Sequence, residues 1–574
     1  MQASVESVAL GRPLGLKPPR AAAGARTSRL AHAASLGAIL LFVVLITLPF
    51  SGQALHIDDA IFWDFARANL ESPLSIDLPD YRLMGDEIAS FRDTHPPLVS
   101  LYMAAIMNLA GSESVAALHI GFMLFPAIAG ISMFYLGRRF TRNALLAALL
   151  LLATPAFMVM SHNFMGDVPM MALWLAATAA YVYGVDRDSA GLLASSGLLA
   201  ALAVFTGYQA LALILLLPLY ALLSGRLSIK TALPVLLPAL AFAWFAFYNL
   251  SYFGALPRFT HARGLSMDGD HLTGRVLGIM LQMGGASVFP LFMAGLFSLR
   301  RKRFLLLPLI AEAAAILGLH QYNPDGYPRA TLILFILFMT AALAAVTAIV
   351  VEGAIQVVRA VSHRQVDTDF AYLALWLLAM MAGVIVLLPH ATAKYLLPFL
   401  APLILLLLKD TEAVVRSKKA VSGILIAATV MTFVTGMAVS AADSQWAQSY
   451  RHYAEGVGER LQPKETVWFV GEWGFRHYME AQGYRYLASS NSSPAEGDII
   501  VRSGFTDWPL SPAVVDRMYL VENTEAQWTM PLRVMSFDAN AGFYGSHWGL
   551  LPFAVTDAPL ERFEVFQIGP NRNT

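Results

Sequence analysis

Apolar runs of about 20 residues recur along the chain, and they limit what it can fold into more than any other feature. A helix of roughly 20 apolar residues is long enough to cross the hydrocarbon core of a bilayer. Hydrophobic residues make up 57% of the 574 residues, and charged residues make up only 14%. Because a water-soluble core of this length does not have such a composition, the sequence predicts a polytopic α-helical membrane protein.

Breaks at charge, glycine or proline divide the apolar runs into about 13 predicted transmembrane helices. Residues 96–110 are also apolar, but at about 15 residues they are too short to span, so we expect an interfacial helix there, in the first outer loop. The predicted spans lie near residues 31–50, 116–136, 143–160, 168–183, 190–206, 209–223, 231–251, 275–298, 304–318, 330–350, 370–388, 395–408 and 419–440.

The distribution of positive charge orients these spans. With the N-terminus inside, the cytoplasmic segments carry 21 Lys and Arg residues, the outer loops carry 8, and the tail after residue 440 carries the other 10. Positive charge favours the cytoplasmic side. The sequence therefore predicts a multi-pass protein of the plasma (inner) membrane whose long first outer loop and C-terminal tail are extracytoplasmic.

Three regions differ in composition. Residues 1–29 form a basic leader rich in Ala, Gly and Pro, which we expect to be disordered and cytoplasmic, and residues 30–440 hold the spans. In residues 441–574 the strand-like runs "TVWFVG", "DIIVR" and "FEVFQIG" alternate with the helical stretch "FRHYMEAQG". This pattern predicts a C-terminal soluble α/β domain.

Charge and cysteine usage exclude several classes of protein. Lys and Arg balance Asp and Glu at 39 each, and no basic patch interleaved with aromatic residues is present, so the sequence predicts no nucleic-acid partner. The chain has no cysteine, which excludes disulfides, thiolate metal sites and thiol nucleophiles.

Acidic residues gather on the predicted outer face. Asp58 and Asp59 stand side by side in "LHIDDAIF", directly after the first span, and Asp93 opens "DTHPPL" at the end of the same loop. Asp167, in "SHNFMGDVPMM", lies at the next outer turn. Acids at a membrane boundary require partners or water. A simpler interpretation is also open, in which Asp58, Asp59 and Asp167 cap helix N-termini.

An acid pair outside the first helix, the Asp93–Leu98 block and a later Asp-x-Pro resemble the GT-C membrane glycosyltransferases. The nearest likeness is to the protein O-mannosyltransferase and aminoarabinose-transferase branches. "AKYLLPFLAPL", from Ala393, is similar to the basic-Tyr-x-x-Pro element of this superfamily, with Lys394 as its basic residue. The aminoarabinose branch has Lys before its Pro-Pro pair, whereas this chain has His95.

The resemblance implies a GT-C-like fold and an inverting transferase that moves a sugar from a polyprenyl-phosphate donor to a lipid, glycan or protein acceptor at the outer face. It implies catalytic roles for Asp58 as general base, Asp59 as its neighbour, and Asp167. Expected ligands of the donor phosphate are Lys394, His95, Arg329 and Arg258. Sugar or acceptor contacts are expected from Asp93, His162, Asn163 and His261.

No cofactor is certain from the sequence. Asp58, Asp59, Asp93 and His95 are residue types that suit a divalent metal ion, although their spacing shows no closed site. A second class of function remains open, a transporter of lipid-linked sugars. Transporters usually show polar groups near the midplane, often in two related halves, whereas this chain places its acids at one surface and shows no internal repeat.

Overall fold

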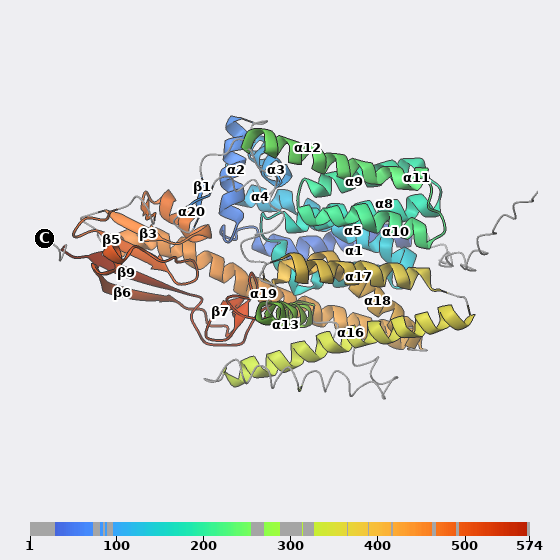
Figure 1. Cartoon of the computed structure of the whole chain (residues 1–574). Helices are drawn as coiled ribbons and strands as arrows, with labels where there is room; N and C mark the ends of the chain where they lie inside the picture. The colour runs from blue at the N-terminus through green and yellow to red at the C-terminus, as the bar shows by residue number, and fades with distance from the viewer. Residues whose placement is uncertain are drawn as a thin grey trace, which may run out of the picture.

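The computed structural model describes residues 29–72, 81–83, 86–88, 96–253, 269–287, 313, 327–363, 366–388, 390–414, 417–461, 466–488 and 493–570. The molecule is elongated, with a bundle of helices at one end and a region of strands at the other (Figure 1). The predicted basic leader, apart from Arg29, lies outside the described residues.

Most helices run along the long axis of the bundle. They are α1 (Arg29–Thr47), α5 (Leu124–Phe140), α6 (Ala144–Ala153), α8 (Asp167–Asp186), α9 (Ala190–Val204), α10 (Leu213–Leu223), α12 (Leu236–Phe253), α16 (Arg329–His363), α17 (Thr368–Leu387), α18 (Leu397–Val414) and α19 (Lys418–Leu461). Helix α13 (Gly269–Ala286) and three short helices complete the bundle: α4 (Val115–Phe122), α7 (Pro155–Met160) and α11 (Ile229–Ala232). Helix α2 (Asp59–Glu71) runs across the bundle end that faces the strands (Figure 1).

Seven of the helical segments in the described part of the chain are long and apolar enough to cross a membrane. Each predicted span overlaps a helix except 304–318, of which the structure describes only residue 313. The total of thirteen spans stays a prediction. The short apolar stretch 96–110 forms the helix α3 (Leu98–Ala110).

Helix α8 is the interior helix of the bundle, and nearly all of its residues are buried. It packs against α5, α9 and α10. Its Trp174 ring lies parallel to Trp376 of α17, with ring centres 6.3 Å apart. Because α8 begins at Asp167, its burial fixes the position of that carboxylate at one end of the bundle.

The C-terminal region contains a five-stranded mixed sheet in the order β4-β3-β5-β9-β6. Its strands are β3 (Val467–Val470), β4 (Arg485–Tyr486), β5 (Ile499–Ser503), β6 (Met518–Ala526) and β9 (Glu561–Ile568). Strand β3 pairs in parallel with β4 and β5, whereas β9 is antiparallel to β5 and β6. A small hairpin, β7 (Met535–Ser536) and β8 (Ala541–Gly542), and the helices α20 (Trp473–Ala481) and α21 (Pro512–Val515) lie in the same region.

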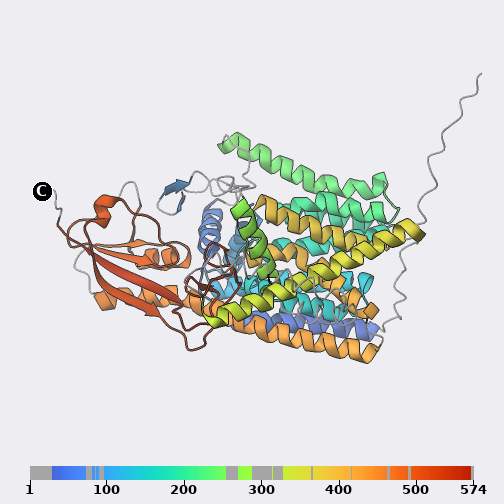
Figure 2. The same ribbon diagram turned by 60° about the horizontal axis from the view of Figure 1, so that its bottom comes forward.

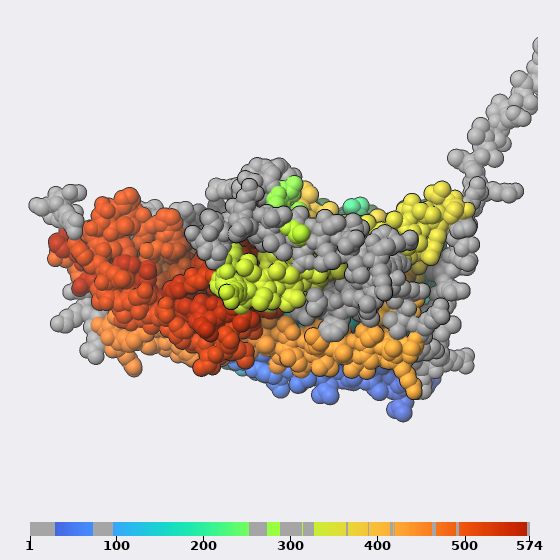
Figure 3. All heavy atoms as spheres, turned by 90° about the horizontal axis from the view of Figure 1, so that it is seen from below, coloured from blue at the N-terminus to red at the C-terminus, as the bar shows by residue number. Residues whose placement is uncertain are grey.

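The three predicted strands and the predicted helix of this region are confirmed as β3, β5, β9 and α20. Helix α19 joins the two ends of the molecule, because it runs without a break from the bundle into the strand region (Figure 2). The predicted boundary at residues 440–441 therefore falls inside one helix, and the division into domains stays a prediction. Beside α19 in the bundle lies α1, where the rings of Phe42 and Phe433 are 5.4 Å apart, and the two helices are neighbours on the face shown in Figure 3.

Candidate active site

Asp58 lies where the segment after α1 turns into α2. It occupies the N-cap position of α2, but its side chain makes no capping hydrogen bond. Its Oδ2 atom lies instead 3.7 Å from the Nζ atom of Lys394, and the two side chains are 20% and 15% exposed respectively. The helix-cap interpretation therefore does not account for the direction of this carboxylate, whereas a partly buried ion pair does.

Lys394 belongs to the short 3-10 helix η7 (Ala393–Leu396), which precedes α18. The hydroxyl of the buried Thr392 accepts a hydrogen bond from the Lys394 backbone N–H at 3.0 Å, and this fixes the start of the turn. The Lys394 ammonium also lies 3.8 Å from Met165 Sδ. Burial disfavours its charge, but Asp167 and Asp58 outweigh that cost and raise the pKa of Lys394 above its ordinary value.

Asp167 is the third charged residue at this position. It is the first residue of α8, and the N-cap is Gly166 rather than Asp167. Asp167 interacts electrostatically with both Lys394 and Asp58. A side chain at position 166 would collide with the Thr206 carbonyl, so glycine there lets the start of α8 pack against the end of α9. Three elements thus bring two carboxylates and one ammonium together at one end of the bundle.

Asp59 points away from this charged group although it follows Asp58 directly. Its side chain is 1% exposed. Its Oδ1 accepts a hydrogen bond from the Phe164 backbone N–H at 2.7 Å, and its Oδ2 accepts one from the His56 backbone N–H at 3.4 Å. Asp59 therefore ties the start of α2 to the turn that precedes α8.

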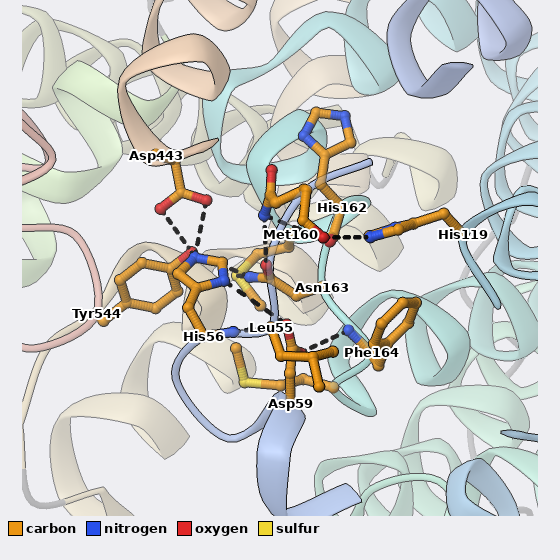
Figure 4. Close-up of polar contacts among 12 residues, drawn as sticks. Leu55, His56, Asp59, His119, Met160, His162, Asn163, Phe164, Asp443 and Tyr544 are labelled. Atoms are coloured by element: carbon orange, nitrogen blue, oxygen red, sulfur yellow. Dashed lines mark hydrogen bonds and ion pairs between the residues drawn. The ribbon is translucent and has the colours of Figure 1, made fainter. Parts of the chain in front are cut away.

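A buried polar cluster lies behind the Asp58 loop (Figure 4). His56 Nε2 is 3.0 Å from Asp443 Oδ2 and 3.2 Å from the Tyr544 hydroxyl, and His56 Nδ1 is 3.6 Å from Asp59 Oδ2. Burial alone would lower the pKa of His56, but Asp443 and Asp59 raise it to about 10. His56 therefore lies between two buried acids, Asp443 and Asp59, and both favour its protonated form.

His162 and Asn163, which were predicted to contact sugar or acceptor, lie in this buried region. His162 Nε2 is 2.8 Å from the Ile46 carbonyl, its ring lies 4.2 Å from that of Phe50, and burial lowers the pKa of His162 to about 3. Asn163 donates a hydrogen bond to the Tyr544 hydroxyl at 3.0 Å and accepts one from Gln53. Apart from His162 Nδ1, which has no hydrogen-bond partner among the described residues, the polar atoms named here bond within the protein and order the turn before α8.

Of the remaining predicted residues, the structure describes only Arg329, and it is not part of this arrangement. Arg329 is exposed at the start of α16, and no hydrogen bond or ion pair in the described part of the chain joins it to Asp58 or Lys394. Four predicted ligands lie outside the described residues: Asp93, His95, Arg258 and His261.

The described residues do not form a metal site, and the predicted ligands Asp93 and His95 lie outside them. Among the described residues no group of three or more His, Asp or Glu side chains is arranged to hold an ion. Asp58 and Asp59, the predicted metal ligands that the structure describes, face different partners, and Asp58 is neutralised by an ammonium. The Lys394 ammonium lies beside the Asp58 carboxylate and supplies a positive charge there, as a bound metal ion would.

Sequence reasoning missed His56, Asp443 and Tyr544. His56 stands two residues before Asp58 in the quoted "LHIDDAIF" stretch, and Asp443 is an acid within a long apolar helix, which is itself a signal of function. Tyr544 carries no local signal, because it joins the cluster only through tertiary structure, from nearly 500 residues along the chain.

Comparison with known proteins supports the resemblance that the motifs predicted. Residues 94–249 match the family described as dolichyl-phosphate-mannose-protein mannosyltransferase. That match confirms the resemblance to membrane glycosyltransferases with lipid-phosphate sugar donors, over less than half of the chain. No curated protein matches the sequence. The matching segment and the apolar helices together indicate a multi-pass membrane protein.

Solved structures with a similar arrangement share little sequence identity. The oligosaccharyltransferase of Archaeoglobus fulgidus, tethered with an acceptor peptide, is 14% identical, with a TM-score of 0.48, and the match covers 80% of this chain and 64% of that one. ArnT from Cupriavidus metallidurans, bound to undecaprenyl phosphate, is 16% identical over 86% of this chain and 97% of that one, with a TM-score of 0.42. The arabinofuranosyltransferase AftD from Mycobacteria is 14% identical over 95% and 40%, with a TM-score of 0.39.

Proposed function

We propose that this chain is an inverting membrane glycosyltransferase that moves a sugar from a polyprenyl-phosphate donor to an acceptor at the outer (periplasmic) face of the plasma membrane. The observation that carries the proposal is the group formed by Asp58, Lys394 and Asp167. A carboxylate able to accept a proton lies 3.7 Å from a cation able to bind phosphate, at one end of an apolar bundle.

The Lys394 ammonium and the Asp58 carboxylate suit the two parts of a sugar transfer, which are departure of the lipid phosphate and deprotonation of the acceptor. The bond between the anomeric carbon and the phosphate oxygen breaks, and its electron pair leaves with the lipid phosphate, whose charge the Lys394 ammonium stabilises. A new bond forms between the anomeric carbon and the acceptor oxygen, and the hydroxyl proton passes to Asp58. With no covalent intermediate, the configuration inverts. If the acceptor is itself a phosphate, it carries no hydroxyl proton, and Asp58 then positions it.

Before the donor binds, the Asp58 carboxylate and the Lys394 ammonium are paired with each other. Lys394 neutralises Asp58 in a partly buried place, and Asp167 supplies a second carboxylate to the same ammonium. When a donor phosphate takes up the Lys394 ammonium, Asp58 loses its partner and becomes available to the acceptor. Asp167 then holds Lys394 in place. This exchange of partners links donor binding to the release of the base.

The distribution of positive charge supports an outward-facing site. At the opposite end of α8 from Asp167, Arg139 forms ion pairs with Asp186 at 2.6 Å and Asp369 at 3.0 Å. Arg138 lies next to it at the end of α5. Positive residues favour the cytoplasmic side, so the end with Asp58 faces outward. We extend the proposal to a soluble extracytoplasmic domain in the C-terminal region and to thirteen spans. We also propose that His95 and Arg258 bind the donor phosphate and that Asp93 and His261 bind the sugar or the acceptor.

Transfer by purified protein in lipid nanodiscs tests the function. A panel of polyprenyl-phosphate sugars is supplied with lipid, glycan and peptide acceptors, and both the free polyprenyl phosphate and the glycosidic product are measured. We expect both products from wild type and neither from Asp58→Asn. Movement of labelled donor across a proteoliposome membrane with no new glycosidic bond would instead identify a transporter.

A further inference from the structure

The backbone beside Asp58 adopts an unfavourable conformation. Ile57 has a φ angle of +49°, in the left-handed region that β-branched residues rarely enter. Its side chain is 3% exposed, so it lies in the core while its neighbour Asp58 turns toward Lys394. Such a conformation persists only where surrounding contacts hold it.

Contacts from the C-terminal region hold this loop. The Tyr478 hydroxyl of α20 accepts a hydrogen bond from the Leu55 backbone N–H at 2.9 Å. Gly474, also in α20, approaches the Leu55 carbonyl so closely that a side chain there would overlap it. The Gln448 amide of α19 donates a hydrogen bond to the Gly52 carbonyl at 2.9 Å. The loop that presents Asp58 is therefore bound to residues that lie hundreds of positions later in the chain.

Tyr544 makes the most central of these contacts. Its hydroxyl donates a hydrogen bond to Asp443 Oδ1 at 2.9 Å, accepts one from Asn163 at 3.0 Å, and lies 3.2 Å from His56 Nε2 (Figure 4). His56 is two residues from Asp58, and Asn163 is four residues from Asp167. The Tyr544 hydroxyl thus connects the segment that carries Asp58 to the segment that carries Asp167.

The residues around Tyr544 hold the segment that carries the ammonium. The Phe543 carbonyl accepts a hydrogen bond from the Ala393 backbone N–H at 3.0 Å, directly before Lys394. Ser546 donates its backbone N–H to the Ala391 carbonyl at 2.8 Å, and its hydroxyl accepts the Ala391 N–H at 3.1 Å. We name residues 543–546 the C-terminal brace.

We propose that the C-terminal brace sets the spacing of Asp58, Lys394 and Asp167, and that Tyr544 and Ser546 are positioning residues for sugar transfer. The proposal rests on the proposed function and assigns the C-terminal region a part in the site itself. The two side chains act on different halves of the site. Tyr544 orders the carboxylate segments through His56 and Asn163, whereas Ser546 orders the lysine segment through Ala391.

Tyr544→Phe and Tyr450→Phe form a matched pair for the test. Tyr450 is also buried, and its hydroxyl also donates to a buried carboxylate, Glu561 Oε2 at 2.7 Å, but it does not contact the Asp58 loop or the Lys394 segment among the described residues. Both substitutions remove one hydroxyl that is bonded to a carboxylate. We expect similar losses of thermal stability from the two variants.

The kinetic results should differ. We expect Tyr544→Phe to lower kcat about 10- to 100-fold while the donor KM stays within about 2-fold of wild type, because the backbone bonds that hold Lys394 remain. We expect Tyr450→Phe to leave kcat within about 2-fold. Ser546→Ala should mainly raise the donor KM, by about 3- to 10-fold, and supplies the same test if Tyr544→Phe does not fold.

A second readout does not depend on activity. Because the chain has no cysteine, Asp58→Cys creates a single thiol whose alkylation by a polar maleimide reports how well the loop is held. We expect Tyr544→Phe to speed this alkylation about 10-fold, and Tyr450→Phe to leave it unchanged.

The outcomes separate the two proposals. An active wild type in which Tyr544→Phe and Tyr450→Phe have equal kcat and equal alkylation rates overturns the brace and leaves the function intact. A wild type that transfers no sugar overturns the function, and the alkylation rates still decide whether the brace holds the loop.

Discussion

Removal of the Lys394 ammonium should separate donor binding from the rest of the site. At 3.7 Å, two opposite unit charges attract by about 4 kcal/mol at an effective dielectric constant near 20, and by about 1 kcal/mol in bulk water. Both side chains are at most 20% exposed, so their attraction is closer to about 4 kcal/mol than to the value in bulk water. A donor phosphate that replaces Asp58 gains a similar contact with Lys394. A hydrogen bond to a charged group contributes about 1.5–3 kcal/mol net, so Lys394→Gln should raise the donor KM about 10- to 100-fold.

The turnover number should fall as well, because the same ammonium stabilises charge that develops on the leaving phosphate. The assay is initial-rate transfer over a range of donor concentrations, together with equilibrium binding of a radiolabelled polyprenyl-phosphate sugar to the protein in nanodiscs.

Lys409→Gln is the matched control. Lys409 lies in α18, about 22 Å further along the chain at 1.5 Å per helical residue, and its ammonium is 3.5 Å from Asp367 Oδ1. Its side chain is 21% exposed, close to the 15% of Lys394. We expect Lys409→Gln to leave the donor KM unchanged. Equal donor binding by the two variants would refute the assignment of Lys394 to the donor phosphate.

Three further predictions concern stability. Burial raises the pKa of Glu561 from 4.5 to about 7, so the folded state holds this proton more tightly than the unfolded state. The free energy of unfolding should therefore fall by up to about 3 kcal/mol as pH rises from 4.5 to 7. In Glu561→Gln the melting temperature should depend less on pH over this range. Gly474→Ala forces a side chain against the Leu55 carbonyl and should cost about 1–3 kcal/mol, visible as a lower melting temperature and faster proteolysis of the C-terminal region; unchanged values would contradict this packing. Arg139→Gln leaves Asp186 without its cation and leaves Asp369 with Lys409 alone, 4.0 Å away. It should cost about 3–5 kcal/mol in thermal unfolding, whereas a loss below about 1 kcal/mol would show that the ion pairs are not formed.

The helical architecture was predictable because hydrophobic length is a local property. A run of apolar residues predicts a helix in lipid wherever its neighbours lie, and the described segments follow that rule. The strands β3, β5 and β9 were also readable, since each is a short run of β-branched and aromatic residues. The order of strands in the sheet was not, because pairing depends on contacts distant in sequence.

The motifs predicted that Asp58, Lys394 and Asp167 belong to the site, but they did not predict which partner each side chain contacts. Asp58 and Asp59 look equivalent in sequence, yet one faces Lys394 and the other is buried against the Phe164 backbone. Successive residues at the start of a helix point about 100° apart, so the two side chains face different partners. The positive φ of Ile57, directly before them, has no sequence signature, since glycine or asparagine is the residue expected there. His56 was overlooked because its partners lie on α19 and beyond.

Single-turnover transfer by Asp58→Asn tests the central claim most directly. Donor is bound first, acceptor is then added, and formation of the glycosidic bond is followed in the same sample in which donor occupancy is measured. The account predicts that donor occupancy is at least that of wild type, because Asp58 no longer competes for Lys394. The rate of bond formation should fall about 100-fold or more, because a general base contributes that much. Bond formation at the wild-type rate with a hydroxyl acceptor would contradict the account.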